Sequence, residues 1–311
     1  MSRTRVVAIV GPTASGKTDL ALSLAERVGG EIVSADARQV YRRLDVGTAK
    51  PSPADRRRVP HHCLDLVEPT EAFDVARYCA AADAAIAAAR DRGRPVVVVG
   101  GTGLYVRVLL RGLCAASGRD DALRAWLSAF AACDPRAARR WLTRLDPAAA
   151  ARVHRNDWMR TVRALEVALT TGRPLSAGQA EHGFAAARYD ARLVGLAVPA
   201  ADLQVRIAQR AHDMVARGWL EEVAALRGDL PADAPAWQTL GYRELRAHLA
   251  GETTLVEALE ATVRATRRFA KRQRTWFRHE PDVSWHDPFR ERDGVLDAAT
   301  AFLVANPPDA G

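Results

Sequence analysis

Short runs of β-branched residues alternate with longer alanine-rich stretches over the first hundred residues. Apolar residues fill the runs at 6–10 and 96–99, whereas the stretches at 18–28 and 76–91 place them at helical spacing. A glycine pair ends the first helical stretch, and the segment 31–36, EIVSAD, then predicts a second strand. Alternation of this kind is typical of a parallel sheet covered by helices. The pattern predicts a doubly wound α/β core of the P-loop type.

The pattern changes beyond residue 113. No convincing strand pattern is present between 115 and 188, where helical spacing predicts helices at 121–132, 135–145 and 158–171. A strand pattern returns at 192–198, so we expect a helical domain inserted into the α/β core. Further helices are predicted at 202–227 and 254–278. The predicted divisions are 1–114 for the first part of the core, 115–190 for the helical insertion, 191–305 for the rest of the core with a basic C-terminal helix, and 306–311 for a frayed tail.

Residues 11–18, GPTASGKT, match the phosphate-binding loop GxxxxGK[ST] at every defined position. The loop lies between the first predicted strand and helix, where successive backbone N–H groups face an anion at a helix N-terminus. Lys17 would bridge phosphate oxygens, and the Thr18 hydroxyl would contact Mg²⁺. The sequence therefore predicts a di- or triphosphate substrate. The expected phosphate-binding residues are Gly11, Pro12, Thr13, Ala14, Ser15, Gly16, Lys17 and Thr18.

The chain lacks an acid where an ATPase or GTPase usually holds its metal. The apolar strand at 96–99 runs into Gly100-Gly101-Thr102-Gly103 instead of ending in aspartate. Another acid, Asp36, follows the neighbouring predicted strand, at the edge where open α/β sheets place their chemistry. Aspartate is also a common turn residue after a strand. Position alone therefore leaves both a catalytic and a structural role open.

The net charge of the chain indicates the kind of partner to expect. A net charge of +8 favours an anionic partner, and only three of the 45 cationic residues, Lys17, Lys50 and Lys271, are lysines. The segment 264–278 contains seven cationic residues and no acid, and their spacing puts several on one helical face. Such a face suits a phosphate backbone, although charge alone fits a solvated helix face equally well.

Other features favour a cytoplasmic enzyme. The cysteines at positions 63, 79, 114 and 133 lack CxxC spacing and are expected to be reduced. No apolar run approaches the length of a membrane span, and no signal-peptide pattern precedes the first strand, so we expect no membrane partner. His61 and His62, near Asp65, resemble metal ligands. Adjacent histidines do not easily face one ion, so we expect a structural role for them.

An ordered set of motifs covers nearly the whole chain. It comprises GPTASGKT, SADARQVY at 34–41, GTAKP at 47–51, HHCLD at 61–65, GGTGLY at 100–105, RVHRNDWMRTVRALEV at 152–167, TGRP at 171–174, LGYREL at 240–245 and RRFAKRQRTWFR at 267–278. In order and spacing this set resembles the tRNA dimethylallyltransferase family, also called tRNA isopentenyltransferases.

The resemblance implies a reaction, a cofactor and a partner. Members of the family transfer a dimethylallyl group from dimethylallyl diphosphate to N6 of the adenosine 3′ of the anticodon, in tRNAs that read codons beginning with U. The P-loop would then hold the diphosphate leaving group with Mg²⁺, which accounts for the missing acid. The family also implies a tunnel in the core and a helical insertion that grips the anticodon stem-loop. We expect a monomer, since one molecule would enclose one stem-loop.

The resemblance also implies residue roles. Asp36 would accept the proton of the poorly nucleophilic N6 amine, Lys17 would stabilise the departing diphosphate, and Thr102 would contact the diphosphate or orient the base; these are the expected catalytic residues. Gln39 would read the flipped base by its amide, and Ala37 stands where the family often has serine, which removes a hydroxyl contact. The residues expected to contact tRNA are Asp36, Ala37, Arg38, Gln39, Thr102, Arg124, Arg160, Thr161, Val162, Arg163, Ala164, Gly241, Tyr242, Arg243, Lys271, Arg272, Gln273, Arg274, Thr275, Trp276 and Arg278.

Three other activities fit parts of the pattern. A P-loop kinase of a nucleoside or small metabolite would turn over ATP without RNA. An adenylate isopentenyltransferase would use a free nucleotide, but it would need neither the insertion nor the basic helix. An RNA-binding or regulatory P-loop protein without catalysis would not need Lys17, Thr18, Asp36 and Thr102 together.

Overall fold

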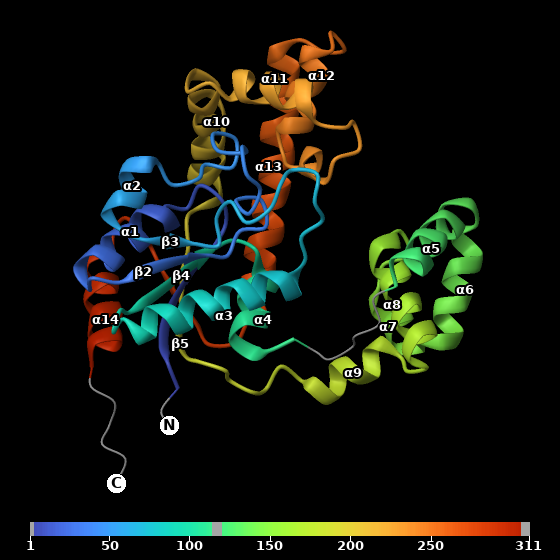
Figure 1. The fold of residues 1–311 in the computed structure, drawn as a ribbon, viewed down its shortest axis with the longest axis horizontal. Coiled ribbons are helices and arrows are strands. Elements are labelled where there is room, and N and C mark those ends of the chain that lie inside the picture. The colour runs from blue at the N-terminus through green and yellow to red at the C-terminus, as the bar shows by residue number, and fades with distance from the viewer. Residues whose placement is uncertain (1–2, 114–119, 306–311) are drawn as a thin grey trace. The chain divides into compact units, whose positions relative to one another are not determined.

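A computed structural model of the 311-residue chain describes residues 3–113 and 120–305. The chain divides into two units, one formed by Met1–Leu110 with Arg188–Gly311 and the other by Arg111–Ala187 (Figure 1). The tail expected at 306–311 and Cys114 lie outside the described residues.

The first unit is built on a six-stranded, all-parallel sheet with the order β3-β2-β4-β1-β5-β6. Its strands are β1 (Arg5–Val10), β2 (Glu31–Ser34), β3 (His61–His62), β4 (Val96–Gly100), β5 (Asp190–Leu196) and β6 (Val283–His286). The central strands β1 and β4 are almost wholly apolar because helices cover both of their faces. The predicted α/β class with a parallel sheet is confirmed.

Helices surround this sheet and extend beyond it. They are α1 (Lys17–Arg27), α2 (Pro53–Arg58), α3 (Val75–Asp91), α4 (Gly103–Arg111), α10 (Ala200–Ala216), α11 (Trp219–Asp229), the 3₁₀ helix η1 (Pro235–Gln238), α12 (Tyr242–Leu249), α13 (Leu255–Arg278) and α14 (Arg292–Val304). On one face, Leu20 and Leu24 of α1 and Leu296 of α14 pack with Ile9 and Val97 of the sheet. This apolar layer holds the N-terminus of α1 against the end of β1.

One predicted helix is wrong in its extent. The segment 202–227 forms two helices, α10 and α11, because Gly218 adopts a left-handed conformation with φ 95° and caps the second one. The indole of Trp219 follows at once and is only 2% exposed. The Trp219 indole, at the first position after the break, belongs to the core.

The second unit is entirely helical over its described residues. It contains α5 (Asp121–Cys133), α6 (Pro135–Leu145), α7 (Pro147–Arg152), α8 (Trp158–Thr171) and α9 (Leu175–His182). An aspartate accepts a backbone N–H at the start of four of these helices, which satisfies donors that a helix leaves unpaired. Leu127, Leu142 and Leu165 form its core and are fully buried.

A second core in the first unit packs helices α11 to α13 against the segment that follows β2. Trp219 and Tyr242 meet edge to face, with ring centroids 5.8 Å apart. Gly47 and Gly241 both press on the Trp219 indole, where an added Cβ would come within 2.0 Å and 2.1 Å of it. Side chains larger than glycine would therefore displace this ring.

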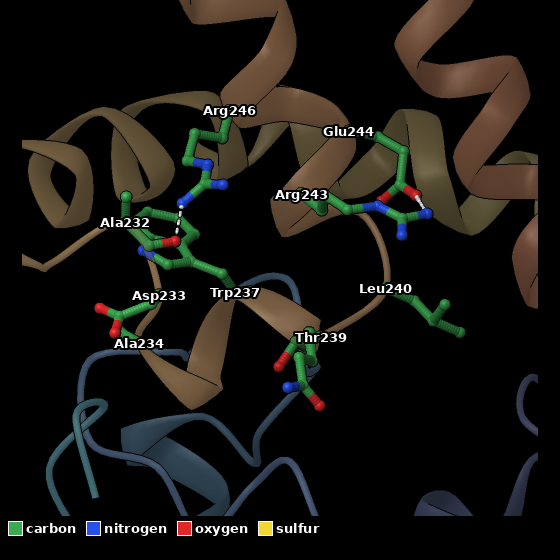
Figure 2. Close-up of a pocket in the computed structure, with 10 residues that line it drawn as sticks. Ala232, Asp233, Ala234, Trp237, Thr239, Leu240, Arg243, Glu244 and Arg246 are labelled. Atoms are coloured by element: carbon green, nitrogen blue, oxygen red, sulfur yellow. Dashed lines mark hydrogen bonds and ion pairs between the residues drawn. The ribbon is translucent and has the colours of Figure 1, made fainter. Parts of the chain in front are cut away.

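A pocket of about 470 Å³ lies beside η1 and α12 (Figure 2). At this pocket the Arg246 guanidinium carbon lies 4.7 Å from the centroid of the Trp237 ring.

The loop that carries GTAKP is held by two polar centres, Glu222 and Lys50. The carboxylate of Glu222 accepts the backbone N–H groups of Asp45, Val46 and Gly47 at 2.7, 2.7 and 3.2 Å, and it also accepts the hydroxyl of Tyr242 at 2.5 Å. This carboxylate therefore fixes the loop to α11 and α12.

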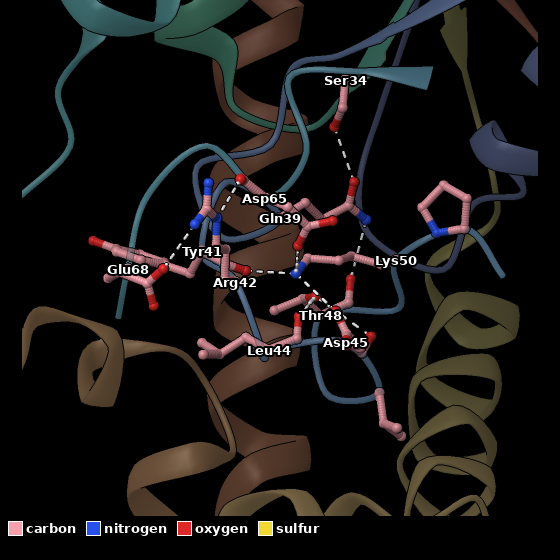
Figure 3. A network of polar contacts seen from close by, with 12 residues as sticks. Ser34, Gln39, Tyr41, Arg42, Leu44, Asp45, Thr48, Lys50, Asp65 and Glu68 are labelled. Carbon is pink, nitrogen blue, oxygen red and sulfur yellow. Dashed lines mark hydrogen bonds and ion pairs between the residues drawn. The ribbon is translucent and has the colours of Figure 1, made fainter. Parts of the chain in front are cut away.

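Lys50 forms the other centre (Figure 3). Its side chain is 1% exposed, and its ammonium donates to the Tyr41 carbonyl at 2.5 Å, to Asp45 at 2.8 Å and to Asp65 at 2.6 Å. Burial opposes the charge of Asp65, but hydrogen bonds from Lys50 and Arg56 outweigh it and lower the pKa of this carboxyl. Lys50 thus joins three points of the segment 41–65.

We expect the substitution Lys50→Met to lower the free energy of unfolding by about 2–4 kcal/mol, because it leaves Asp45 and the Tyr41 carbonyl without the buried ammonium and leaves Asp65 with only Arg56 as a cation. The matched control is Lys271→Met, since Lys271 is exposed on α13 and its removal should change stability by less than about 0.5 kcal/mol. Urea denaturation of the two variants and the parent measures both values. Equal stability of the two variants would contradict the structural role of Lys50.

Candidate active site

The P-loop takes the conformation that an anion site requires. Gly16 adopts φ 87° and caps α1, so the first N–H groups of that helix face outward from its N-terminus. Ala14 also has a positive φ of 63°, which is costly for a residue with a side chain. Its carbonyl accepts a hydrogen bond from Arg206 of α10 at 2.9 Å. Helix α10 therefore fixes the apex of the loop.

Positive charge is concentrated at this loop. The Lys17 ammonium donates to the Pro12 carbonyl at 2.5 Å. Burial, and next the nearby Arg210, lower the pKa of Lys17 to about 7, while Asp36 acts in the opposite direction. Burial also lowers the pKa of Arg210. A bound anion would relieve this crowding of cations.

One buried hydroxyl in the loop is left over. Ser15 is 1% exposed, and its Oγ has no hydrogen-bond partner within the described part of the chain. Buried polar groups are nearly always hydrogen-bonded, so an unpaired one at a phosphate-binding loop points to a ligand acceptor. The loop therefore fits a phosphate group by charge and by hydrogen bonding.

Asp36 and Thr102 lie beside each other at the carboxyl ends of β2 and β4. The Asp36 carboxylate accepts the N–H of Arg38 at 2.8 Å, while the Thr102 hydroxyl accepts the N–H of Ala37 at 3.0 Å. The backbone N–H of Thr102 donates to the Ala35 carbonyl at 3.2 Å. Asp36 also interacts electrostatically with Lys17. Parallel strands thus bring Lys17, Asp36 and Thr102 to one edge of the sheet.

The Gln39 amide, which was expected to read the base, makes its hydrogen bonds within the protein in this structure. Its amide nitrogen donates to the carbonyls of Thr48 and Ala49, both at 3.2 Å, and its oxygen accepts the Ser34 hydroxyl at 2.9 Å (Figure 3). Both amide N–H groups are therefore engaged inside the protein. The side chain ties β2 to the GTAKP loop instead of presenting donors to a base.

The helical-unit residues expected to contact tRNA, Arg124 and the segment 160–164, also include both exposed side chains and side chains that are engaged inside the protein. Arg124 and Arg163 both bind Glu166, which is fully buried, with N–O distances of 2.9 Å. Burial opposes the charge of Glu166, but the hydrogen bonds from these arginines outweigh it and lower its pKa. Arg160 points outward with 69% of its side chain exposed, paired with Asp157. Other residues of the strip belong to the core: these are Thr161, Val162 and Ala164.

The LGYREL motif also mixes core and surface. Gly241 packs against Trp219, and the Tyr242 ring is fully buried. Their expected contact with tRNA therefore cannot involve the Tyr242 side chain in this conformation. Arg243 remains 73% exposed, next to Glu244, and it lines the pocket beside α12 (Figure 2).

Helix α13 turns different residues of the KRQRTWFR segment inward and outward. Lys271, Arg272, Thr275 and Arg278 are exposed, whereas Gln273 is 6% exposed. The Trp276 ring is covered by Arg107, whose guanidinium lies 4.5 Å from the ring centroid, and Gly103 lies at the ring edge. Trp276 therefore packs onto α4 and is not presented as a stacking platform. Arg274 is half-buried.

Arg206 and Arg210 are functional candidates that sequence reasoning missed. They lie one turn apart on α10, which follows β5, the strand that pairs with β1. The only available signal was this order of elements, because neither arginine belongs to a recognised motif.

The described residues were also compared with what a metal site or a membrane span would require. The His62 ring contacts the buried Glu31 carboxylate at 2.6 Å, and the His61 ring contacts the Val59 carbonyl at 2.8 Å. No cluster of three or more His, Cys, Asp or Glu side chains that could hold a metal occurs in residues 3–113 and 120–305. Over the same ranges, no helix is both long and apolar enough to cross a membrane.

Comparisons with known proteins identify the family of this chain. A family model described as IPP transferase matches residues 39–280, and one described as isopentenyl transferase matches residues 4–65. A tRNA dimethylallyltransferase of Geobacter metallireducens is 48% identical, over 96% of this chain and 98% of that protein. One of Anaeromyxobacter sp. (strain K) is 52% identical, over 98% of this chain and 99% of that protein.

Two solved structures extend the comparison. The full-length tRNA isopentenylpyrophosphate transferase of Bacillus halodurans is 36% identical, covers 97% of each chain and has a TM-score of 0.72. A eukaryotic dimethylallyltransferase acting on tRNA is 26% identical, covers 98% of this chain and 80% of its own, and has a TM-score of 0.85. With a matching family model over most of its length and relatives of this similarity, the chain belongs to the tRNA dimethylallyltransferase family.

Proposed function

We propose that this chain transfers a dimethylallyl group from dimethylallyl diphosphate to N6 of the adenosine 3′ of the anticodon, in tRNAs that read codons beginning with U. One observation carries the proposal: a cationic P-loop and the Asp36 carboxylate meet at one edge of the sheet, with Thr102 beside them. A leaving diphosphate and an amine that loses a proton require these two groups together. A P-loop kinase is not favoured, since the named relatives are tRNA dimethylallyltransferases.

The proposed step exchanges one bond for another. The N6 nitrogen forms a bond to the allylic carbon while the carbon–oxygen bond breaks, and the electron pair leaves with the diphosphate. Asp36 accepts the proton that N6 loses. The P-loop N–H groups, Lys17 and the arginines of α10 stabilise the charge that develops on the leaving group. Thr102 holds the Asp36 segment in place through the Ala37 N–H.

Magnesium fits the donors that this site offers. Thr18 lies in the first turn of α1 with an exposed side chain, and the unpaired Ser15 hydroxyl is in the same loop. Mg²⁺ commonly keeps several waters and binds substrate phosphates, and in phosphate-binding loops the Ser or Thr hydroxyl after the lysine contacts it. When bound, Mg²⁺ would supply positive charge to the diphosphate oxygens. Thr18 is the residue that would hold it.

The residues proposed to contact RNA are exposed cations in each of the two units. In the first unit, α13 carries Arg267, Arg268, Lys271 and Arg272, and in the helical unit Arg160 is exposed. Their side chains reach solvent, whereas the buried members of the same motifs hold the fold that presents them. We propose that these cations contact the phosphate backbone of the anticodon stem-loop in a cytoplasmic, monomeric enzyme.

The proposal is tested by incubating the chain with dimethylallyl diphosphate, Mg²⁺ and an unmodified tRNA that reads a UNN codon. Mass spectrometry should find one dimethylallyl group on the adenosine 3′ of the anticodon. Asp36→Asn should lower turnover by about 10²- to 10⁴-fold, the usual contribution of a general base, and should retain tRNA affinity. The control Asp297→Asn changes an exposed acid on α14. Labelling of a nucleoside by ATP instead would overturn the function, and loss of tRNA affinity would overturn the base assignment.

The lowered pKa of Lys17 predicts how the binding of inorganic diphosphate depends on pH. Burial lowers the pKa of Lys17 to about 7 in the free protein, whereas a bound anion favours the charged form. Below that pKa the side chain is charged in both states, so Lys17 adds no pH dependence. Above it, binding takes up a proton and affinity should fall by about tenfold per pH unit.

Isothermal titration in two buffers of different ionisation enthalpy measures this proton uptake. Lys17→Met removes the lysine contribution and retains the ionisation of diphosphate itself, so the difference between parent and variant isolates Lys17. Equal uptake by the two proteins would contradict the role of this ammonium.

The α13 surface predicts the salt dependence of tRNA binding. Arg267→Gln combined with Arg268→Gln should reduce the slope of log affinity against log salt by about 1 to 2, because each phosphate contact contributes about 0.7 to 0.9. Arg90→Gln, which removes an exposed arginine of α3, is the control. Filter binding at a series of salt concentrations gives the slopes, and an unchanged slope in the double variant would assign this helix face to solvent.

A further inference from the structure

Gln273 is a buried amide in the middle of a basic helical segment. It is 6% exposed, and both ends of its amide are hydrogen-bonded to backbone groups of the proposed active site. The oxygen accepts the N–H of Thr13 at 2.8 Å, and the nitrogen donates to the carbonyl of Gly101 at 2.9 Å. One side chain of α13 therefore joins the P-loop to the turn that follows β4.

The contact at Gly101 requires the absence of a side chain there. A Cβ added to Gly101 would lie 2.0 Å from the amide nitrogen of Gln273. The glycine therefore lets the helix approach the turn closely enough for the hydrogen bond. Glutamine suits both partners, since the Thr13 N–H needs an acceptor and the Gly101 carbonyl needs a donor.

From Gly101 the hydrogen bonds continue to the proposed base. Thr102 donates its N–H to Ala35 and accepts the N–H of Ala37, which flank Asp36 on both sides. A continuous path therefore runs from the P-loop through Gln273 and Thr102 to Asp36. The proposed diphosphate site and the proposed base are held at a fixed separation by this path.

Helical geometry puts this amide opposite the exposed cations. Ala270, Gln273 and Phe277 are buried at spacings of three and four residues, whereas Lys271 and Arg272 face solvent on the same turn. Arg107 over Trp276 holds the following turn against α4. The same turn of α13 therefore carries RNA-facing charge on one side and an active-site hydrogen bond on the other.

We propose that Gln273 is a positioning residue, which aligns the P-loop with Thr102 and Asp36 and does not itself contact RNA. The inference rests on the proposed function for its consequence in catalysis. The P-loop must hold the diphosphate at the correct distance from N6, and misplacement of reacting groups by about 1 Å can cost 10²-fold in rate. Gln273 sets this distance through two hydrogen bonds.

Two variants of the full-length chain test the role. Gln273→Met keeps a similar volume and removes both hydrogen bonds, whereas Gln273→Glu keeps an acceptor for Thr13 and sets a carboxylate oxygen against the Gly101 carbonyl. Both variants should lower kcat at saturating tRNA by about 10- to 100-fold, because buried partners are left unpaired. Gln273→Met should also weaken binding of inorganic diphosphate by about tenfold. The tRNA Kd should stay within about twofold of the parent value, because the exposed cations are unchanged.

Lys271→Met is the matched control on the same turn. It should weaken tRNA binding and leave the affinity for inorganic diphosphate at the parent value, which is the opposite pattern. Circular dichroism melting checks that each variant folds, and Gln273→Glu decides the outcome if Gln273→Met does not fold.

The outcomes separate the positioning role from the function itself. A parent protein that transfers no dimethylallyl group overturns the proposed function, while the diphosphate affinity of the variants still tests the P-loop contact. If the parent is active and the Gln273 variants lose tRNA affinity but keep kcat and diphosphate affinity, Gln273 is an RNA contact and the positioning role is wrong. Parent-like values throughout would also overturn it.

Discussion

The site depends on a single constraint, the convergence of parallel strands at one edge of a sheet. Because β1, β2 and β4 run in the same direction, the segments that leave them, the P-loop, Asp36 and Thr102, emerge side by side. Close backbone contact makes the arrangement tight: an added Cβ at Gly100 would lie 2.1 Å from the Ala35 carbonyl oxygen. Distances between proposed reactive groups are therefore set mainly by backbone hydrogen bonds, with α10 and α13 clamping the P-loop from outside the sheet.

The sheet and the P-loop could be predicted because their signals are local. A continuous apolar strand followed by GPTASGKT specifies both a buried parallel strand and an anion site from adjacent residues. The division of 202–227 into two helices could not be predicted from local signals, because a glycine can also occur inside a helix and the left-handed conformation of Gly218 accompanies the packing of Trp219 into the core. Tertiary contacts thus divided a segment that sequence spacing predicted as one helix.

Motifs located functional segments, but they did not reveal which way each side chain points. Gln39, Tyr242 and Gln273 all lie in motifs associated with RNA, yet each uses its polar atoms to hold a loop or strand of the protein. Their exposed neighbours, such as Arg243 and Arg272, present charge to solvent. Sequence spacing identifies such a segment as a unit, whereas the direction of each side chain depends on partners far away in the chain, such as Glu222 for Tyr242.

The chain has only three lysines, and at two of these positions the structure explains why lysine is present and not arginine. Lys50 satisfies three acceptors that surround one buried point, and Lys17 reaches back over its own loop to the Pro12 carbonyl. A compact ammonium can donate in three directions from a single atom, whereas a planar guanidinium spreads its donors over a wider fork. Arg206 and Arg210 approach the same P-loop from α10, where Arg206 donates to the single carbonyl of Ala14. Lys271 is exposed on α13, where no buried acceptors require a compact ammonium. An arginine at this position would therefore make the same proposed phosphate contact.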